Sequence, residues 1–264
     1  MTMEELRKIQ IEILDYIDGL CCKNNIDYYL AYGTALGAVR HHGFIPWDDD
    51  IDIIFTREGY NRLLNVFQKN ENGIYKLLSI QTDRKYSYPI AKVVDTRTYL
   101  KREQYRYTAD LGAYVDVFVL DSIAPIHKLA VLQKIICRFL QNGWVYSEHK
   151  YNIGKSKIKR IKISIYRLIP ARCYSVLLHA VASAFRKNKT GEVCSLAFNT
   201  YGYTEESYTK KMIGDGTRKI AFENREYPVF QDVEKYLHQL YGDYMTPPPI
   251  EKRTCPHDNN VIYK

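Results

Sequence analysis

The segment Trp47–Phe55, which reads WDDDIDIIF, constrains the fold of this chain more than any other part of the sequence. Its alternation of acidic and apolar residues is typical of a β-strand, whose side chains point to opposite faces in turn. One face would carry three carboxylates, and the apolar residues between them would enter a hydrophobic core. The acids predicted to share that face are Asp48, Asp50 and Asp52.

A row of carboxylates on one face is unfavourable unless a cation lies among them, because like charges at short distance repel one another. Mg²⁺ or Mn²⁺ is the simplest counter-charge, since hard cations prefer oxygen ligands. Runs of Asp also occur in solvated turns and helix caps, and the run alone leaves that alternative open. Its continuation into an apolar strand favours the metal site.

A second acid lies in the apolar stretch Ala113–Asp121. Alternating valines mark one face of this predicted strand, so Asp116 points to the other face. Asp is disfavoured inside strands, and a metal shared with a neighbouring strand would explain its presence. The alternative is an edge Asp bonded to a backbone amide. Asp121, at the strand's end, is expected to be a turn residue.

Groups that can bind phosphate flank the predicted carboxylate strand. Gly33, Thr34 and Gly37 offer backbone N–H groups and a hydroxyl at the start of a short helical segment, which is a plausible anion cradle. Arg40 could reach a phosphate with two hydrogen bonds. Lys92 lies in an apolar strand and could point toward the acids. For both cations a plain surface position is an equal alternative.

Periodicity predicts a mixed sheet with helices against it, an α+β fold. Helices are expected over residues 3–24, 34–41, 57–69, 127–150, 157–187 and 231–241, with an interruption near Pro170. Strands are expected over residues 28–32, 51–55, 74–79, 90–95 and 114–120. We expect a catalytic core over residues 1–126, a helical basic insertion over 127–199, and a segment over 200–264 that packs on the core and the active site.

The charge of this chain is uneven. The formal net charge is +8, and no acid occurs between His149 and Glu192. Basic residues alternate there with apolar ones over residues 150–190, a pattern typical of helices that lie on an anionic membrane surface. A helical insertion with a solvated basic face is an equal alternative. Nucleic acid is not expected as a partner, because basic charge alone is weak support and no helix-turn-helix is apparent.

The chain starts without a basic and apolar leader, and it lacks a run of roughly 18 apolar residues that could span a bilayer. The six cysteines show no CxxC pair or zinc-finger spacing, so we expect reduced thiols. These features together predict a cytoplasmic protein, with a peripheral contact at the inner face of the membrane if residues 150–190 bind lipid.

The segment YGTALGAVRHHGFIPWDDDIDI resembles the core pattern of the LicD family, which includes the fukutin-related transferases. Further resemblance lies in AKVVD with Thr98, in VDVFVLD followed by Pro125, and in YLHQLYGDYMTPPPIEKR with His257. The similarity covers residues 5–125 and 220–258, and no motif is assigned to 127–200.

This resemblance implies a nucleotidyltransferase-like fold and Mg²⁺-dependent transfer of a phosphorylated alcohol, phosphocholine or an alditol phosphate, from CDP-choline or a CDP-alditol. The acceptor would be a hydroxyl of a cell-surface glycan such as lipopolysaccharide, teichoic acid or capsule, and CMP would leave. Asp50, Asp52 and Asp116 are the expected catalytic residues, with Arg253 and His257 as contacts from the C-terminal segment.

Three other readings remain open at this point. A nucleotidyltransferase proper would attack the α-phosphorus and release pyrophosphate. A glycosyltransferase with a DxD motif would need a doubly wound sheet before the motif, and only about 50 residues precede Asp50. A basic membrane-surface adaptor without activity would explain the cations of residues 150–190 but not the four acids. The sequence does not identify the transferred group, the acceptor or the oligomeric state.

Overall fold

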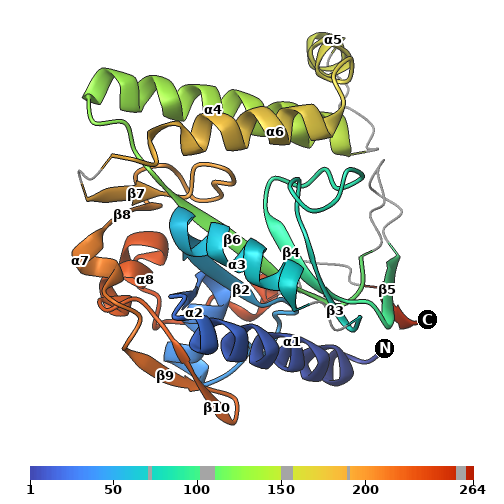
Figure 1. Ribbon diagram of the computed structural model, residues 1–264, viewed down its shortest axis with the longest axis vertical. Coiled ribbons are helices and arrows are strands. Elements are labelled where there is room, and N and C mark those ends of the chain that lie inside the picture. Colours follow the sequence, from blue (N-terminus) through green and yellow to red (C-terminus); the bar gives the residue numbers. More distant parts are fainter. Residues whose placement is uncertain (71–72, 102–110, 150–156, 189–190, 254–259) are drawn as a thin grey trace.

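The computed structural model describes residues 1–70, 73–101, 111–149, 157–188, 191–253 and 260–264. At its centre lies a mixed seven-stranded sheet in the order β1-β2-β6-β4-β3, with β7 pairing with β6 and β8 pairing with β7 (Figure 1). The strands are β1 (Tyr29–Leu30), β2 (Asp52–Thr56), β3 (Tyr75–Leu78), β4 (Ala91–Asp95), β6 (Tyr114–Ser122), β7 (Glu192–Cys194) and β8 (Ser207–Thr209). This confirms the expected α+β class.

The valine face of β6 carries the core, as the alternation predicts. Val115 and Val117 are fully buried, and β2 lies parallel to β6 with Ile53 opposite Val117. Two helices, α1 (Met3–Asn24) and α3 (Arg57–Lys69), lie against the sheet in Figure 1. Hydroxyl side chains cap both helices, because Thr2 accepts from the N–H of Glu5 and Thr56 from that of Gly59. The opposite face of β2 and β6 carries Asp52 and Asp116.

Helices of the middle segment form a separate layer, at the top of Figure 1. They are α4 (His127–Glu148), α5 (Lys157–Tyr166) and α6 (Ala171–Ala182). The interruption expected near Pro170 is confirmed, because α5 ends before this residue and Pro170 directly precedes α6. Among the described residues no helix combines the length and apolar character that crossing a bilayer requires.

Several short strands were not predicted. They include β7 and β8 as well as the pairs β9 (Lys219–Phe222) with β10 (Arg225–Pro228) and β5 (Thr98–Lys101) with β11 (Asn260–Tyr263). None is longer than four residues, so periodicity has too few positions to act on. The remaining helices are α2 (Tyr32–His41), α7 (Lys210–Ile213) and α8 (Val233–Tyr241), with single 3₁₀ turns at Ser183–Phe185 and Ile250–Lys252.

Candidate active site

Three charged side chains form one row across the centre of the sheet. Asp52 of β2 lies opposite Asp116 of β6, and Asp116 lies opposite Lys92 of β4. Residues directly opposite one another point to the same face. The alternation of each strand therefore sets two carboxylates and an ammonium side by side, although they come from segments far apart in the chain.

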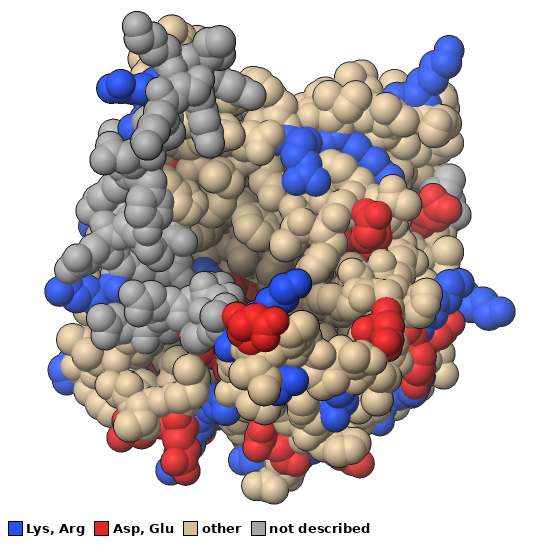
Figure 2. Space-filling view, turned by 180° about the vertical axis from the view of Figure 1, so that it is seen from behind, with Lys and Arg blue, Asp and Glu red and all other residues tan. Residues whose placement is uncertain are grey.

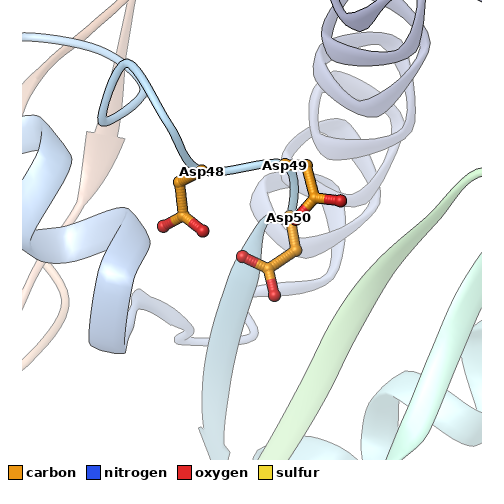
Figure 3. A group of neighbouring side chains, drawn as sticks. All are labelled: Asp48, Asp49 and Asp50. Carbon is orange, nitrogen blue, oxygen red and sulfur yellow. The ribbon is translucent and has the colours of Figure 1, made fainter. Parts of the chain in front are cut away.

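Asp48 and Asp50 do not lie on the strand that the sequence predicts. Strand β2 begins only at Asp52, so both residues belong to the loop before it, and Figure 3 shows this loop with Asp48, Asp49 and Asp50. The prediction of one strand face was wrong for these two residues, because the loop backbone is fixed by side chains of α1 rather than by strand pairing.

The contacts of α1 with this loop are specific. The guanidinium of Arg7 donates to the carbonyl oxygens of Ile45 (3.0 Å) and Asp48 (2.6 Å). The buried amide of Gln10 donates to the carbonyl oxygen of Asp49 at 2.9 Å. Sequence reasoning missed both residues, since an Arg and a Gln on an amphipathic helix resemble ordinary surface positions.

Helix α2 positions the same loop from the other side. A Cβ added to Gly33 would lie 2.6 Å from Oδ2 of Asp48, so the close approach of this carboxylate requires glycine. The backbone N–H of Asp52 donates to the buried hydroxyl of Thr34 at 2.8 Å. Gly33 therefore lies directly beside the Asp48 carboxylate, and the hydroxyl of Thr34 fixes the first residue of β2.

Two overlapping groups of carboxylates can hold a metal ion. Asp50, Asp52 and Asp116 each offer an oxygen within 4.8 Å of the others, and Asp48, Asp49 and Asp50 do the same. Hard divalent cations prefer such all-oxygen sets. Asp50 belongs to both groups.

The electrostatics of Asp52 indicate that this site needs a positive charge. Burial raises the pKa of the Asp52 carboxyl well above its usual range, and the neighbouring carboxylates of Asp50, Asp116 and Asp48 raise it further. The nearby ammonium of Lys92 lowers the pKa of Asp52. One ammonium therefore offsets only part of the repulsion, and the residues fit a bound divalent cation.

Lys92 is held from two sides. Its ammonium forms a buried ion pair with Asp116, and its Nζ lies 3.7 Å from the ring centroid of Tyr114. Of the two alternatives that the sequence left open, the structure places Lys92 inside, at 3% exposure.

A buried carboxylate outside the metal groups organises one wall of the site. Glu206 accepts hydrogen bonds from the backbone N–H groups of Thr200 (2.6 Å) and Tyr201 (2.7 Å) and from the hydroxyl of Tyr32 (2.7 Å). Tyr32 has a left-handed backbone (φ +43°), and its N–H donates to the hydroxyl of Tyr236 at 2.8 Å. A residue with a strained backbone persists only where its surroundings fix it. Here the surroundings are Glu206 and Tyr236, which are distant from Tyr32 in the sequence, so the sequence did not reveal this network.

A cavity of about 390 Å³ opens between these elements. Its acidic end is lined by Asp48, Asp50, Asp52 and Asp116, and much of the remaining lining is aromatic. On the face seen in Figure 2 the surface is hollowed near its middle, and most of the visible wall there is uncharged. The volume suits a small-molecule ligand.

The other predicted contact residues do not line this cavity. Gly37 packs against the chain, because a Cβ there would lie 2.4 Å from the carbonyl oxygen of Gly43. Arg40 donates to the carbonyl oxygen of Tyr244 at 2.7 Å, and Arg253 lies 5.0 Å from the ring centroid of Trp47. His257 lies outside the described residues.

The fold and the site define a nucleotidyltransferase-type domain, in which a Gly-Thr pair at the start of a helix precedes paired acids and a neighbouring strand supplies a third. Residues 25–128 match the family described as "LicD/FKTN/FKRP, nucleotidyltransferase domain". Residues 25–128 are therefore identified as a LicD-type domain.

Relatives of known sequence support the assignment. The chain is 28% identical over 266 aligned residues to a Haemophilus influenzae protein named "Lipopolysaccharide cholinephosphotransferase LicD", with 100% of this chain and 98% of that protein covered. It is also 41% identical over 68 residues to an uncharacterized protein of Rickettsia prowazekii, of which 24% is covered. A 39-residue match to an uncharacterized protein of Rickettsia typhi reaches 65% identity and covers 13% of that protein.

Proposed function

We propose that this protein transfers a phosphorylated alcohol from a CDP-linked donor to a hydroxyl of a cell-surface glycan and releases CMP, with Mg²⁺ or Mn²⁺ as cofactor. One observation carries the proposal: Asp50, Asp52 and Asp116 meet within 4.8 Å at the end of a cavity. Whole-length similarity to a protein named as a lipopolysaccharide cholinephosphotransferase supports phosphocholine and lipopolysaccharide as the first candidates.

Asp50, Asp52 and Asp116 would hold the metal ion, with Asp48 at the edge of the set. A bound divalent cation would neutralise phosphate charge in the donor and stabilise the leaving oxygen. The chain's own residues would bind and orient the reactants. The fixed loop of Asp48–Asp50 would hold the cation that attracts the donor diphosphate, and the wall at Thr200 and Tyr201 would exclude water.

The reaction is a displacement at the distal phosphorus of the donor. The acceptor oxygen forms a bond to that phosphorus while the bond to the CMP oxygen breaks, and the hydroxyl proton passes to a carboxylate, for which we propose Asp116. Lys92 would hold Asp116 in place and offset charge that develops on the phosphoryl oxygens. Arg40, Arg253 and His257 remain proposed contacts for the leaving nucleotide in a closed complex.

Incubation of the purified protein with a panel of CDP-alcohols, Mg²⁺ and lipopolysaccharide or teichoic acid tests this function. We expect CMP release with at least one donor, loss of turnover with EDTA, and recovery on adding Mg²⁺ or Mn²⁺. Absence of CMP with every donor and acceptor, or turnover indifferent to EDTA, would contradict the proposal.

A nucleotidyltransferase proper is the second candidate, because the family description names that domain type. It would release pyrophosphate from a nucleoside triphosphate rather than CMP. The glycosyltransferase alternative loses support, since only α1, β1 and α2 precede Asp50 in the chain. Product analysis separates the two phosphoryl-transfer reactions.

A peripheral membrane contact is part of the proposal. The face of α4 exposes Leu132 (49%), Ile135 (59%) and Phe139 (53%), and Leu168 before α6 is 80% exposed. Among the apolar residues of the basic segment, Ile161 and Ile165 are exposed as well, whereas Ile163 and Leu178 are buried. Exposed apolar side chains on a basic layer suit an anionic lipid surface.

Some basic side chains of residues 150–190 bind the protein itself and are not available to a lipid surface. The guanidinium of Arg172 donates to the carbonyl oxygens of Ile80 (2.8 Å) and Tyr86 (2.6 Å), and Arg167 donates to that of His149 at 2.8 Å. The exposed cations of the described segment include Arg160, Arg186 and Lys187. We therefore propose the insertion over residues 127–199 as a lipid-facing layer on the catalytic core, and the division 1–126, 127–199 and 200–264 remains a proposal with it.

A further inference from the structure

The turn of the β9–β10 hairpin contacts the chain shortly before the acidic loop. The backbone N–H of Glu223 donates to the carbonyl oxygen of His42 at 2.8 Å, and Oε1 of Glu223 accepts from the N–H of Phe44 at 3.0 Å. Phe44 is 179 residues away in the sequence. The hairpin lies outside residues 25–128, the part of the chain that matches the family domain. A C-terminal element therefore holds a segment of that domain.

Residues 42–44 fit closely against this turn. A Cβ added to Gly43 would lie 2.3 Å from Oε1 of Glu223, so only glycine lets the carboxylate approach this near. On the other side, the carbonyl oxygen of Gly43 packs against Gly37 of α2. The segment is therefore confined between the hairpin turn and α2.

Glu223 has a backbone conformation that glutamate rarely adopts. Its φ is +54°, and it is the first of the two residues between the paired Phe222 and Arg225. Two-residue hairpin turns prefer Gly, Asn or Asp at positive φ, and a residue held in this region persists only where its surroundings fix it. The turn would form more easily with glycine, so turn formation does not explain this glutamate. Its contacts with His42 and Phe44 do.

The same stretch of chain continues directly into the carboxylates of the site. Phe44 packs on Phe222 of the hairpin at 5.0 Å between ring centroids, and the guanidinium of Arg7 lies 4.9 Å from the Phe44 centroid. Arg7 also holds the carbonyl oxygen of Asp48. Glu223 thus fixes the entry to the acidic loop, and Arg7 fixes the loop itself. Only three residues separate Phe44 from Asp48, so a shift at one end is felt at the other.

Open space borders this contact. A groove of about 670 Å³ is lined by Arg7, Phe44 and Glu223 together with other residues of α1 and the hairpin turn. Among the described residues it shares none of its lining with the carboxylate cavity. A segment beside such a groove has room to move when a contact is removed, because no close-packed protein holds it on that side. The hydrogen bonds of Glu223 therefore matter for the position of residues 42–44.

We propose that Glu223 is a positioning residue for the metal site. Its carboxylate and N–H fix the path by which residues 42–44 enter the acidic loop, and this path sets where the carboxylates of Asp48–Asp50 lie. Asp50 belongs to both groups of candidate ligands, so a displaced loop weakens the whole site. The inference rests on the proposed function, because it concerns the cation of that reaction.

Calorimetric titration of the purified protein with Mn²⁺ tests this inference without turnover. Glu223→Gly removes the carboxylate but suits the left-handed backbone, so the hairpin is expected to persist. We expect its Kd for Mn²⁺ to rise about tenfold, the usual effect of removing a residue that orients metal ligands. Glu223→Asn also tolerates this backbone and is too short to reach the N–H of Phe44, so it should show the same loss.

Glu223→Gln and Asn224→Gly are the controls. Gln keeps an oxygen that accepts from the N–H of Phe44, and Asn224 is the exposed neighbour in the same turn. Both should bind Mn²⁺ as wild type does. Urea denaturation measures the stability of each variant, because a purely structural role would lower stability without changing the Kd of the folded protein.

The outcomes separate this inference from the proposed function. Unchanged Mn²⁺ affinity in folded Glu223→Gly and Glu223→Asn would overturn the inference and leave the proposed function standing. A similar loss in Glu223→Gln or Asn224→Gly would also overturn it, because the hydrogen bond from Phe44 would not be the cause. A raised Kd in the Gly and Asn variants, without CMP release by wild type from any CDP-linked donor, would support the positioning role and contradict the proposed reaction. Absence of Mn²⁺ binding to wild type would contradict both.

Discussion

At the scale of single residues, the site depends on two aspartates that the strands place opposite one another. Asp52 and Asp116 are 9% and 7% exposed, so neither charge is well screened by water. Asn has nearly the shape of Asp but no charge. An Asp→Asn substitution therefore tests the role of the carboxylate in metal binding while largely preserving the packing.

We expect Asp52→Asn and Asp116→Asn each to lower the rate of CMP release about 10³-fold, which corresponds to about 4 kcal/mol of lost stabilisation. The fold should persist in Asp52→Asn, because the substitution removes repulsion between neighbouring carboxylates. Asp116→Asn also removes the charge paired with buried Lys92, so urea denaturation checks the stability of that variant. Turnover with and without added Mg²⁺ is the measurement. Asp215→Asn, at an exposed position, is the matched control, and normal turnover in either site variant would refute the assignment.

At the scale of elements, a buried ion pair joins the start of α3 to the end of β6. Arg57 donates to both carboxylate oxygens of Asp121, at 2.7 and 2.6 Å, and Asp121 has no exposed surface. The expectation that Asp121 is a turn residue was therefore wrong. Its partner is 64 residues away in the sequence, and local turn chemistry does not reveal such a contact.

Removing one partner of this pair leaves a buried charge without compensation. We expect Asp121→Ala to lower the free energy of unfolding by about 3–5 kcal/mol, measured by urea denaturation. Glu234→Ala, which breaks the surface pair with Arg218, should cost at most about 1 kcal/mol. Equal effects of the two substitutions would show that burial does not determine the strength of the first pair.

The same junction includes a buried histidine of α6. Burial lowers the pKa of His179 from 6.5 to about 4, and the charge of Arg57 adds to the shift. His179 Nε2 lies 2.6 Å from the carbonyl oxygen of Pro89, and Nδ1 lies 3.4 Å from Nη1 of Arg57. A neutral imidazole with its proton on Nε2 satisfies both contacts, because Nε2 donates and Nδ1 accepts.

This shift predicts acid sensitivity. The unfolded chain binds a proton at His179 below pH 6.5 whereas the folded chain does so only near pH 4, so the stability from this group is complete above pH 6.5 and is lost as the pH falls toward 4. Between about pH 7.5 and pH 5 we expect a loss of about 2 kcal/mol. Urea titrations of wild type and His179→Gln at both pH values measure it, and parallel pH profiles for the two proteins would rule it out.

At the scale of the whole molecule, the α4–α6 layer gives the protein one apolar and basic end. The net charge of +8 favours anionic partners, and the exposed apolar face of α4 would give the proposed membrane contact a direction. A peripheral position would keep the cavity close to a lipid-linked glycan acceptor.

We expect wild type to float with vesicles that contain phosphatidylglycerol and not with pure phosphatidylcholine vesicles, and high salt should weaken the binding. Leu132→Glu and Ile135→Glu should each reduce binding about tenfold, because a charge replaces apolar contact at exposed positions. Ile250→Glu, an equally drastic change at a 78% exposed residue outside α4–α6, should not. Equal flotation of all variants would contradict the proposed membrane contact through the α4–α6 layer.

The sequence by itself determined the strands that carry Asp52 and Asp116 and the valine face of β6, because strand alternation acts between near neighbours in the chain. Only the tertiary structure decided that Lys92 pairs with Asp116, that Arg7 and Gln10 fix the acidic loop, and that Glu206 holds the wall at Tyr201. These contacts join residues distant in the sequence, and each depends on the direction of a single side chain after packing. No local sequence pattern carries that information. The sequence therefore indicates the acids of the site but not the residues that position them.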